Sequence, residues 1–232
     1  MTYARPSHLR LVASEPKPVP ARQPRLRFRP VVSLSDGSPF GLDAEADIAF
    51  EETVRPGRTS PHEQVSAATW LGDLIERACR LARGAETSER PMSILAPMAA
   101  LGDQDAPLAA EAAVQRAGAL AQEIRIDFCD ASVFGLEDLA MDRIDAFRRR
   151  GFRTGLDARR SWRTPMGARA RMTFEAVRID LTRLAGEEIP VSRMAVASAG
   201  GVALIAHQAR WREAAALAEL GVAYAVCPRA DS

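Results

Sequence analysis

The chain has 232 residues, of which 47% are hydrophobic, and its formal net charge is +1. A chain of this length and composition can bury the core of one α/β domain. The near-neutral balance gives no general argument for binding nucleic acid. Lys17 is the only lysine, so the positive charge is almost wholly arginine, which suits bidentate contacts with carboxylates and phosphates.

Cysteine usage and hydropathy both indicate a cytoplasmic protein. Cys79, Cys129 and Cys227 lie far apart and form no CxxC pair, which fits a reducing compartment. The longest weakly polar run, residues 194–206, falls well short of the roughly 20 residues that a membrane helix needs. Because Glu15 and Pro16 interrupt the N-terminal apolar residues, no signal core is recognised there.

Residues 1–24 are expected to form a flexible, basic, proline-rich arm, followed by one barrel domain over residues 25–232. The arm has five prolines among basic residues and too little apolar surface to offset the entropy lost on ordering. It can be a solvated tail, or it can contact an acidic partner or lipid headgroups.

The first half of the domain predicts two strands, a helix, a strand and a helix. Residues 26–50 read as two antiparallel strands joined by a tight turn at Ser35–Ser38. Apolar residues at helical spacing predict a helix from Val65 to Arg83, which Gly84 ends. A short strand, PMSILAPM, precedes an alanine-rich helix from about residue 105 to residue 122.

From residue 123 onward, strands alternate with helical or loop segments, which is typical of a parallel sheet. The expected strands are EIRIDF, FRTGLD, AVRID, VALIAH and VAYAVC. Helices are expected over residues 136–150, from Pro190, and over residues 209–220, whereas an arginine-rich loop follows FRTGLD and a short turn follows AVRID.

Polar side chains stand at the carboxyl ends of four successive strands, at Asp127, Asp157, Asp180 and His207. In a parallel barrel these ends form the active face, so we predict a shared site, present or ancestral. The competing explanation is that such strand-end acids cap the next helix.

These segments, in this order and spacing, resemble the EAL family of cyclic di-GMP phosphodiesterases from about Leu26 to Arg229. FRPVVSLSDG resembles the opening strand and turn of the family, and GLDAEAD its G-x-EAL-x-R motif. IDFCD resembles the ExxE segment, GLDARRSW the DDFGTG loop, VRID the KID strand and IAHQAR the AEGVE segment. The resemblance implies an α/β fold, an EAL-type modified TIM (β/α)8 barrel with an antiparallel first strand.

The chain departs from the family at positions that the resemblance makes catalytic. The family would hold divalent ions with carboxylates and an asparagine, and would position water with a lysine. Positions that match these functional residues but differ in type are Asp43, Asp47, Leu95, Asp127, Ala158, Arg178, His207, Arg210 and Val226. Ala158 removes an acid, and Asp47 reverses the charge of the arginine that grips the dinucleotide. The comparison therefore implies neither catalysis nor tight cyclic di-GMP binding, and no cofactor.

The predicted pocket is vestigial and consists of Asp43, Asp127, Asp157, Arg178, Asp180 and His207. No metal is expected there, because nearby arginines (Arg159, Arg160 and Arg178) can neutralise the acids in a closed network. The alternative is a reshaped site in which three of the aspartates and His207 hold one Zn²⁺ or Mn²⁺ ion.

The arginine-rich stretch from Arg148 to Arg171 replaces the loop that couples dimerisation to metal binding in the family. Arginine and tryptophan are favoured interface anchors, so we predict a protein partner with an acidic surface. The predicted contact residues are Arg159, Arg160, Trp162 and Arg163. A solvated face is the alternative for this stretch, and nucleic acid is the weaker one, since one aromatic interleaves the charges. A homodimer is the other kind of partner that the sequence leaves open.

By family analogy, this is a catalytically inactive regulatory protein that acts through protein binding in motility, cell-surface or cell-cycle control. One alternative is a cyclic di-GMP sensor that does not hydrolyse its ligand. The other is a residual metal-dependent phosphodiesterase.

Overall fold

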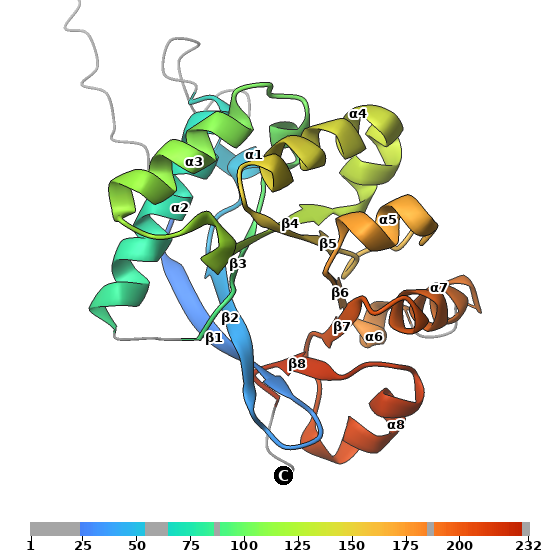
Figure 1. Cartoon of the computed structure of the whole chain (residues 1–232). Helices are drawn as coiled ribbons and strands as arrows, with labels where there is room; N and C mark the ends of the chain where they lie inside the picture. Colours follow the sequence, from blue (N-terminus) through green and yellow to red (C-terminus); the bar gives the residue numbers. More distant parts are fainter. Residues whose placement is uncertain (1–23, 54–64, 86–88, 185–187, 229–232) are drawn as a thin grey trace, which may run out of the picture.

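The computed structural model describes residues 24–53, 65–85, 89–184 and 188–228, and it forms a closed eight-stranded barrel surrounded by helices (Figure 1). The strands are β1 (Leu26–Ser33), β2 (Pro39–Ala46), β3 (Met92–Leu95), β4 (Ile124–Cys129), β5 (Arg153–Asp157), β6 (Ala176–Ile179), β7 (Ala203–Ala206) and β8 (Tyr224–Val226). The predicted basic arm, apart from residue 24, lies outside the described residues.

Strand β1 runs antiparallel to both of its neighbours, β2 and β8, and the other neighbouring strands pair in parallel. The α/β class and the modified TIM barrel with an antiparallel first strand are thereby confirmed. Because β1 is reversed, its first residue lies at the end of the barrel where the other strands finish. We call this end the mouth.

The helices are α1 (Phe50–Thr53), α2 (Ala67–Gly84), α3 (Ala106–Ala117), α4 (Asp130–Arg149), α5 (Ala168–Thr173), α6 (Leu181–Leu184), α7 (Glu188–Ala199) and α8 (Ala214–Glu219). Short 3-10 turns are η2 (Met98–Leu101), η3 (Ala121–Glu123) and η4 (Trp211–Glu213). Within the described residues, no helix combines the length and hydrophobicity that crossing a bilayer requires.

Local sequence explains where several elements begin and end. The β1–β2 turn closes around Asp36, whose Oδ1 accepts from the Ser38 backbone at 3.0 Å, and Gly37 adopts a φ of 72°. Ser66 caps α2 by accepting from the Thr69 backbone at 3.1 Å. Gly118, with a φ of 63°, ends α3 five residues before the predicted boundary near residue 122.

The helix after β4 and the loop after β5 differ from the sequence expectation. Helix α4 begins at Asp130 rather than near residue 136, and Glu137 interrupts it with a φ of 43°. The arginine-rich segment contains a short helix, α5, that the loop expectation missed. The residues of α4 before the break at Glu137 are too few to show a full apolar pattern, and α5 is rich in arginine, so apolar periodicity gave no clear signal for either segment.

The barrel wall separates two apolar regions. Side chains that point outward from the strands, such as Ile126, Leu156 and Leu204, join the helices in the main core. A small inner cluster of Val31, Ala176, Ile205 and Val226 fills part of the interior. Because side chains alternate along a strand, the positions between the outward-facing residues of β4, β5 and β6 face the interior. Those positions carry the polar residues of the predicted site.

Candidate functional site

The interior of the barrel near its mouth is filled by charged rather than apolar side chains. Asp43, Arg125, Asp127 and Arg178 expose 3% or less of their surface, and Asp157 exposes 8%. Charged groups are almost never buried this completely unless they are paired. Their partners therefore determine what the site can do.

Arg178 on β6 bridges two buried carboxylates from other strands. Its Nη1 lies 2.8 Å from Asp43 Oδ1 and 3.3 Å from Asp127 Oδ2. Asp127 has a second cationic partner on its own strand, because Arg125 Nε donates to Oδ1 at 3.0 Å. Gly155 on β5 makes room for this carboxylate, since a Cβ there would lie 2.2 Å from Asp127 Oδ1.

The rim of the same network is closed by Arg29 and Arg159. Arg29 Nη2 lies 2.9 Å from Asp43 Oδ2, 3.1 Å from Glu45 Oε2 and 3.0 Å from His207 Nε2. Arg159 holds Asp157 with two parallel contacts, of 2.8 Å to Oδ1 and 2.9 Å to Oδ2. Fork-to-fork pairs of this kind are among the strongest hydrogen-bonded contacts in proteins.

The charges of this network balance. Its four guanidinium groups belong to Arg29, Arg125, Arg159 and Arg178, and its four carboxylates to Asp43, Glu45, Asp127 and Asp157. Burial lowers the pKa of His207 to about 4, and the neighbouring Arg159, Arg178 and Arg29 add to this effect. The imidazole is therefore neutral at pH 7, and we call the whole set the barrel network.

Two carboxylates of the barrel network, Asp43 and Asp157, are held in their ionised form. Burial opposes ionisation of Asp43, but Arg178 and Arg29 outweigh it and lower the pKa. Burial likewise opposes ionisation of Asp157, and Arg159 reverses the balance, so its pKa is also below the ordinary value. Burial alone would lower the pKa of Arg178, whereas Asp43 and Asp127 raise it. Each ion stabilises its partner.

His207 makes stability depend on pH in a defined window. Its pKa is about 4 in the folded chain and has the ordinary value of 6.5 in the unfolded chain. As the pH falls, the unfolded chain therefore binds a proton at a higher pH than the folded chain does. Stability should be complete above pH 6.5 and should fall as the pH drops towards 4, and urea unfolding at several pH values will measure it. A His207→Gln variant, which keeps an acceptor for Arg29, should lose this slope. An unchanged slope in the variant would contradict the assignment to His207.

The arrangement does not fit the pair of divalent ions that the resemblance would require. Such ions need several free oxygen ligands around one point. Here a guanidinium contacts each carboxylate of the network, and Arg178 stands between two of them. Within the described part of the chain, no group of three or more His, Cys, Asp or Glu side chains could hold a metal ion.

Five of the six predicted pocket residues meet in the barrel network, and Asp180 does not. Asp180 Oδ1 accepts from the Thr182 backbone at 3.1 Å and from Thr182 Oγ1 at 2.6 Å, so it caps the short helix α6. The expectation that Asp180 shares the pocket is thus wrong, and the competing capping explanation holds for it.

Sequence reasoning missed three members of the network: Arg29, Glu45 and Arg125. Strand alternation could have found two of them. Glu45 follows Asp43 by two residues and Arg125 precedes Asp127 by two, so each shares a strand face with a predicted residue. Arg160, which was expected to neutralise the pocket, is exposed and makes no described contact with it.

The arginine-rich loop is anchored by a buried acid that the sequence did not single out. Asp130 Oδ2 accepts from Ser161 Oγ at 3.0 Å and from the Arg163 backbone at 2.7 Å. Trp162 lies between these residues and exposes 3% of its surface. The expectation of Trp162 as an exposed anchor is therefore wrong, because the loop turns its ring into the core.

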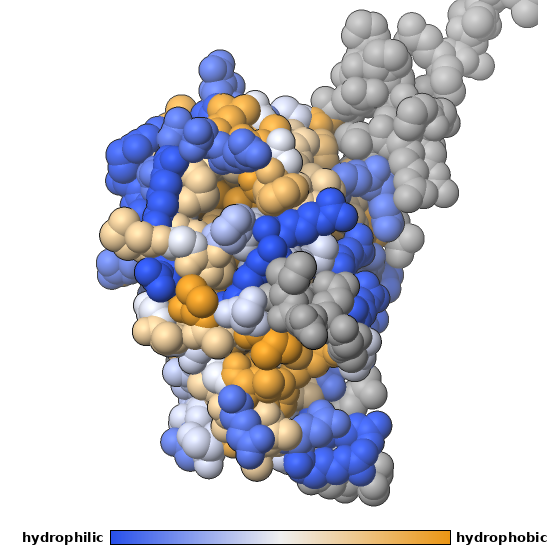
Figure 2. Space-filling model, turned by 90° about the vertical axis from the view of Figure 1, so that its right-hand side faces the viewer, coloured by the Kyte–Doolittle hydropathy of each residue, from blue (hydrophilic) through white to orange (hydrophobic). Residues whose placement is uncertain are grey.

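Two of the four predicted contact residues do offer their side chains to solvent. Arg160 and Arg163 are exposed, whereas Arg159 is held by Asp157. Several other arginines of the stretch pair with nearby acids, including Arg148 with Asp145 and Arg153 with Glu175. Figure 2 shows the face that lies on the right in Figure 1, where apolar areas are interrupted by charged residues.

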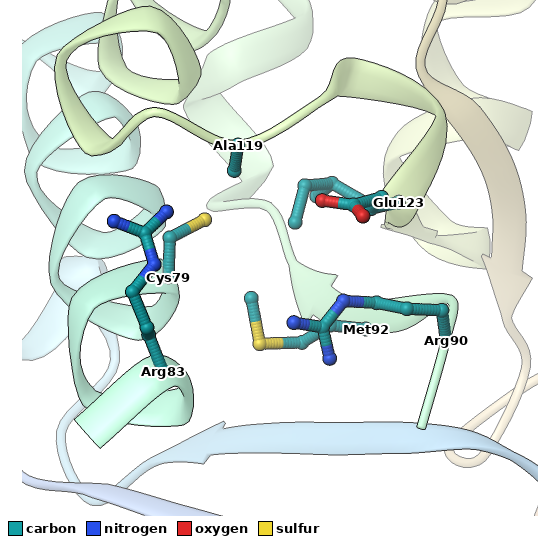
Figure 3. Close-up of a pocket in the computed structure, with 7 residues that line it drawn as sticks. Cys79, Arg83, Arg90, Met92, Ala119 and Glu123 are labelled. Atoms are coloured by element: carbon teal, nitrogen blue, oxygen red, sulfur yellow. The ribbon is translucent and has the colours of Figure 1, made fainter. Parts of the chain in front are cut away.

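A separate cavity of about 240 Å³ lies at the opposite end of the barrel, beside the first residues of β3 and β4. Figure 3 shows Arg83, Arg90, Glu123 and the thiol of Cys79 around it. Arg83 Nη2 donates to Ala117 O at 2.7 Å and to Gly118 O at 2.9 Å. This arginine therefore caps the C-terminal carbonyl groups of α3, and the cavity lies where the ends of α2 and α3 meet.

Cys79 in this cavity should react with alkylating reagents more slowly than the exposed Cys227. Burial raises its pKa to about 11, and it exposes 5% of its surface, whereas Cys227 is exposed. Because only the thiolate reacts, iodoacetamide at pH 8 should modify Cys79 roughly tenfold or more slowly than Cys227. Mass spectrometry of the alkylated peptides will follow both sites. Equal rates in the folded chain would contradict the prediction, and the unfolded chain in urea serves as the control.

Comparison with known proteins agrees with the architecture. No protein-family model matches the sequence, and no curated protein matches it. Among solved structures, the PaMucR phosphodiesterase in complex with c-di-GMP has a TM-score of 0.68 and 13% identity, covering 88% of this chain and 89% of that chain. The FimX EAL domain has a TM-score of 0.65 and 16% identity, covering 88% of both chains.

BlrP1 of Klebsiella pneumoniae, in a calcium and cyclic di-GMP complex, has a TM-score of 0.68 and 15% identity. The alignment covers 91% of this chain but 56% of BlrP1, so the chain spans about half the length of that protein. At these identities the likeness is one of fold. The chain thus has the barrel fold of the EAL domains found in cyclic di-GMP signalling proteins.

Proposed function

We propose that this chain is a cytoplasmic regulatory protein with an EAL-type barrel that does not hydrolyse cyclic di-GMP and that acts by binding another protein. The observation that carries the proposal is the position of Arg178. Its Nη1 stands within 3.3 Å of Asp43 and Asp127, so a guanidinium bridges carboxylates that would otherwise be available to cations. Two-metal catalysis depends on ions held between such ligands, and it is worth several kcal/mol of transition-state stabilisation.

Charge balance supports the same proposal. A divalent ion that entered the barrel network would have to displace a buried arginine and leave its positive charge unpaired. Removing one partner from a buried ion pair costs roughly 3–5 kcal/mol. Metal binding would therefore carry the free-energy cost of unpairing this arginine, a cost that is absent in a site without such a pair.

The activity test is a direct one. Incubation with cyclic di-GMP and either Mg²⁺ or Mn²⁺, followed by chromatography of the nucleotides, should yield no product above the level of the Asp157→Ala variant. Product formation by the natural chain that disappears in Asp157→Ala would overturn the proposal and establish a residual phosphodiesterase.

The contact surface of the proposal is the exposed part of the arginine-rich loop. Arg160 and Arg163 are exposed, and Asp130 fixes the backbone that carries Arg163 at 2.7 Å. Rigid, exposed arginines favour an acidic protein surface, because their forks match carboxylates without a large loss of side-chain entropy.

Affinity capture from a native lysate should test this surface. The variant Arg160→Ala/Arg163→Ala should lose captured proteins that the natural chain retains. The matched control, Arg80→Ala/Arg116→Ala, removes two exposed arginines from α2 and α3 and should retain them. Identical captured proteins in both variants would reject the loop as the contact surface.

A second candidate is a sensor that binds cyclic di-GMP without cutting it. Two buried donor atoms of the barrel network, Arg29 Nε and Arg178 Nη2, lack a hydrogen-bond partner among the described residues. Spare guanidinium donors suit phosphate oxygens. The solved structures of PaMucR and BlrP1 are complexes with that dinucleotide. Calorimetric titration separates the two candidates: micromolar binding favours the sensor, and an absence of heat favours protein binding alone.

A further inference from the structure

The first part of α4 forms an exposed corner over residues 134–139, with the sequence FGLEDL, which we call the α4 corner. All six residues are exposed, and Phe134, Leu136 and Leu139 expose 42%, 37% and 50% of their surface. Large apolar side chains that are exposed together commonly mark interaction surfaces. In Figure 2, apolar and charged surfaces lie side by side at the top of the molecule, at the height of α4 in Figure 1.

The backbone of the α4 corner is strained. Glu137 has a φ of 43° and a ψ of −114°, values that break the helix within an otherwise regular segment. A non-glycine residue in a sparsely populated region costs of order 1–3 kcal/mol and persists where other contacts hold it. The break leaves six consecutive residues outside the core, whereas an unbroken amphipathic helix would bury part of them.

The α4 corner is acidic as well as apolar. Glu137 and Asp138 belong to it and Asp142 follows it in α4, and the side chains of Asp138 and Asp142 expose 93% and 73% of their surface. Arg169 is their cationic neighbour, at 3.1 Å from Asp138 Oδ1 and 2.8 Å from Asp142 Oδ1. Arg143 donates to Gln104 O at 3.2 Å. Arg169 thus pairs with two of these three acids, and a basic, apolar segment would complement the surface.

A segment of that chemistry leaves the barrel at the same end as the α4 corner. Leu26 pairs with Ala46, the last residue of β2, and Arg25 N donates to Asp47 Oδ1 at 2.6 Å. Residues 1–23 therefore join the described chain at the mouth. A chain of contacts connects the mouth to α4. The Met98 backbone in η2 donates to Glu51 Oε1 in α1 at 2.8 Å, and η2 packs against α4.

We propose that residues 1–23 of this chain bind the α4 corner. The run LRLVA, residues 9–13, would place Leu9, Leu11 and Val12 against the apolar side chains of the corner. The basic residues of the segment are Arg5, Arg10, Lys17 and Arg22, against the single acid Glu15. They would lie close to Glu137 and its acidic neighbours, where opposite charges favour the contact.

Reach and charge both favour this occupant. An extended segment spans roughly 3.3 Å per residue, so about 20 residues can cross the face of a domain of this size. Attachment to the same chain gives an effective concentration of order millimolar, which lets a weak contact form. The mouth itself is a poor competitor, because Arg25, Arg27, Arg160 and Arg163 are exposed there and repel a basic segment.

Hydrogen exchange of the full-length chain tests the proposal. In the variant Leu9→Ser/Leu11→Ser/Val12→Ser, backbone amides of residues 134–139 should exchange at least about threefold faster than in the natural chain, because the cover is lost. Peptides from α2 should be unchanged. The matched control, Ala4→Ser/Ala13→Ser/Ala21→Ser, adds three serines without removing a large apolar side chain and should exchange like the natural chain.

The reciprocal variant strengthens the test. Phe134→Ser/Leu139→Ser should make residues 1–23 more accessible to trypsin at Arg10 and Arg22, neither of which is followed by proline, with circular dichroism confirming that the barrel is folded. Equal exchange of residues 134–139 in all three chains of the first experiment would overturn the proposal. Protection that rises with protein concentration would also overturn it, because a second copy would then be the occupant.

Discussion

Replacing Arg178 by methionine is expected to lower the free energy of unfolding by about 3–5 kcal/mol. Arg178 exposes 3% of its surface and contacts both Asp43 and Asp127, so the variant leaves two buried carboxylates with weaker compensation. Methionine keeps the unbranched apolar part of the side chain, so the loss of volume that accompanies the loss of charge is reduced. Urea unfolding at pH 7 measures the difference.

The matched control is Arg183→Met, because Arg183 also pairs with an aspartate, Asp180 at 3.6 Å, but exposes 59% of its side chain. An exposed pair contributes at most about 1 kcal/mol. The Arg178 variant should also regain part of this loss as the pH falls through the acid range, because protonation removes the buried charge of Asp43, for which Arg29 is then the remaining described partner. A loss below 1 kcal/mol at pH 7 would show that the barrel network is not closed around Arg178.

A single added methyl group at Gly155 should have an effect of similar size. The Cβ of Gly155→Ala would lie 2.2 Å from Asp127 Oδ1 and 3.3 Å from Ala176 O. Either the strand or the carboxylate must move, and moving the carboxylate breaks its contact with Arg125. We expect a loss of roughly 3 kcal/mol in the free energy of unfolding, since overpacking a rigid core costs about 1–3 kcal/mol and a disturbed buried pair adds to it.

Gly84→Ala is the control for this substitution. Gly84 is the last residue of α2, and a Cβ there meets nothing within 4 Å. The change should be neutral or slightly stabilising, because alanine loses less backbone entropy than glycine in a helix. Equal stability of Gly155→Ala and Gly84→Ala in thermal unfolding would mean that the interior is looser than the contacts around Asp127 indicate.

The two substitutions address one property of the interior, namely that its polar groups are stabilised by one another. In a typical parallel barrel the interior is filled by layers of branched apolar side chains. Here apolar filling is limited to a small cluster around Val31 and Ile205, and ion pairs fill the space nearer the mouth. The stability of such an interior depends on its charge balance. This is the physical basis for proposing a binding protein rather than an enzyme.

Strain at the mouth is consistent with a binding role for that end of the molecule. The described non-glycine residues with a positive φ are Glu137, Gln208 and Cys227. Cys227 directly follows the end of β8, and Gln208 lies two residues after the end of β7. Strained backbone of this kind gathers at functional sites, where surrounding contacts hold it in place.

The sequence by itself determined the order and type of most elements, the antiparallel first strand and the position of acids at strand ends. These features depend on local signals. Alternation marks a strand, the turn at Ser35–Ser38 is too short for anything but an antiparallel link, and Gly84 ends a helix whatever surrounds it. The predicted pocket residues Asp127, Asp157 and His207 could be grouped because parallel strands finish at one end of a barrel, whereas Asp43 was added by the resemblance to the EAL family.

Only the tertiary structure decided which charges meet. Arg29 and His207 are 178 positions apart in the chain, yet their side chains lie 3.0 Å apart because β1 returns against β8 and closes the barrel. No periodicity carries that information. The same holds for Trp162, which lies among polar residues in the sequence but is buried in the structure. Asp130 holds the loop against the core through Ser161, which is 31 positions away in the chain. Charges that are distant in the chain can pair because the barrel closes, and the closing of the barrel depends on the whole sheet rather than on any one segment.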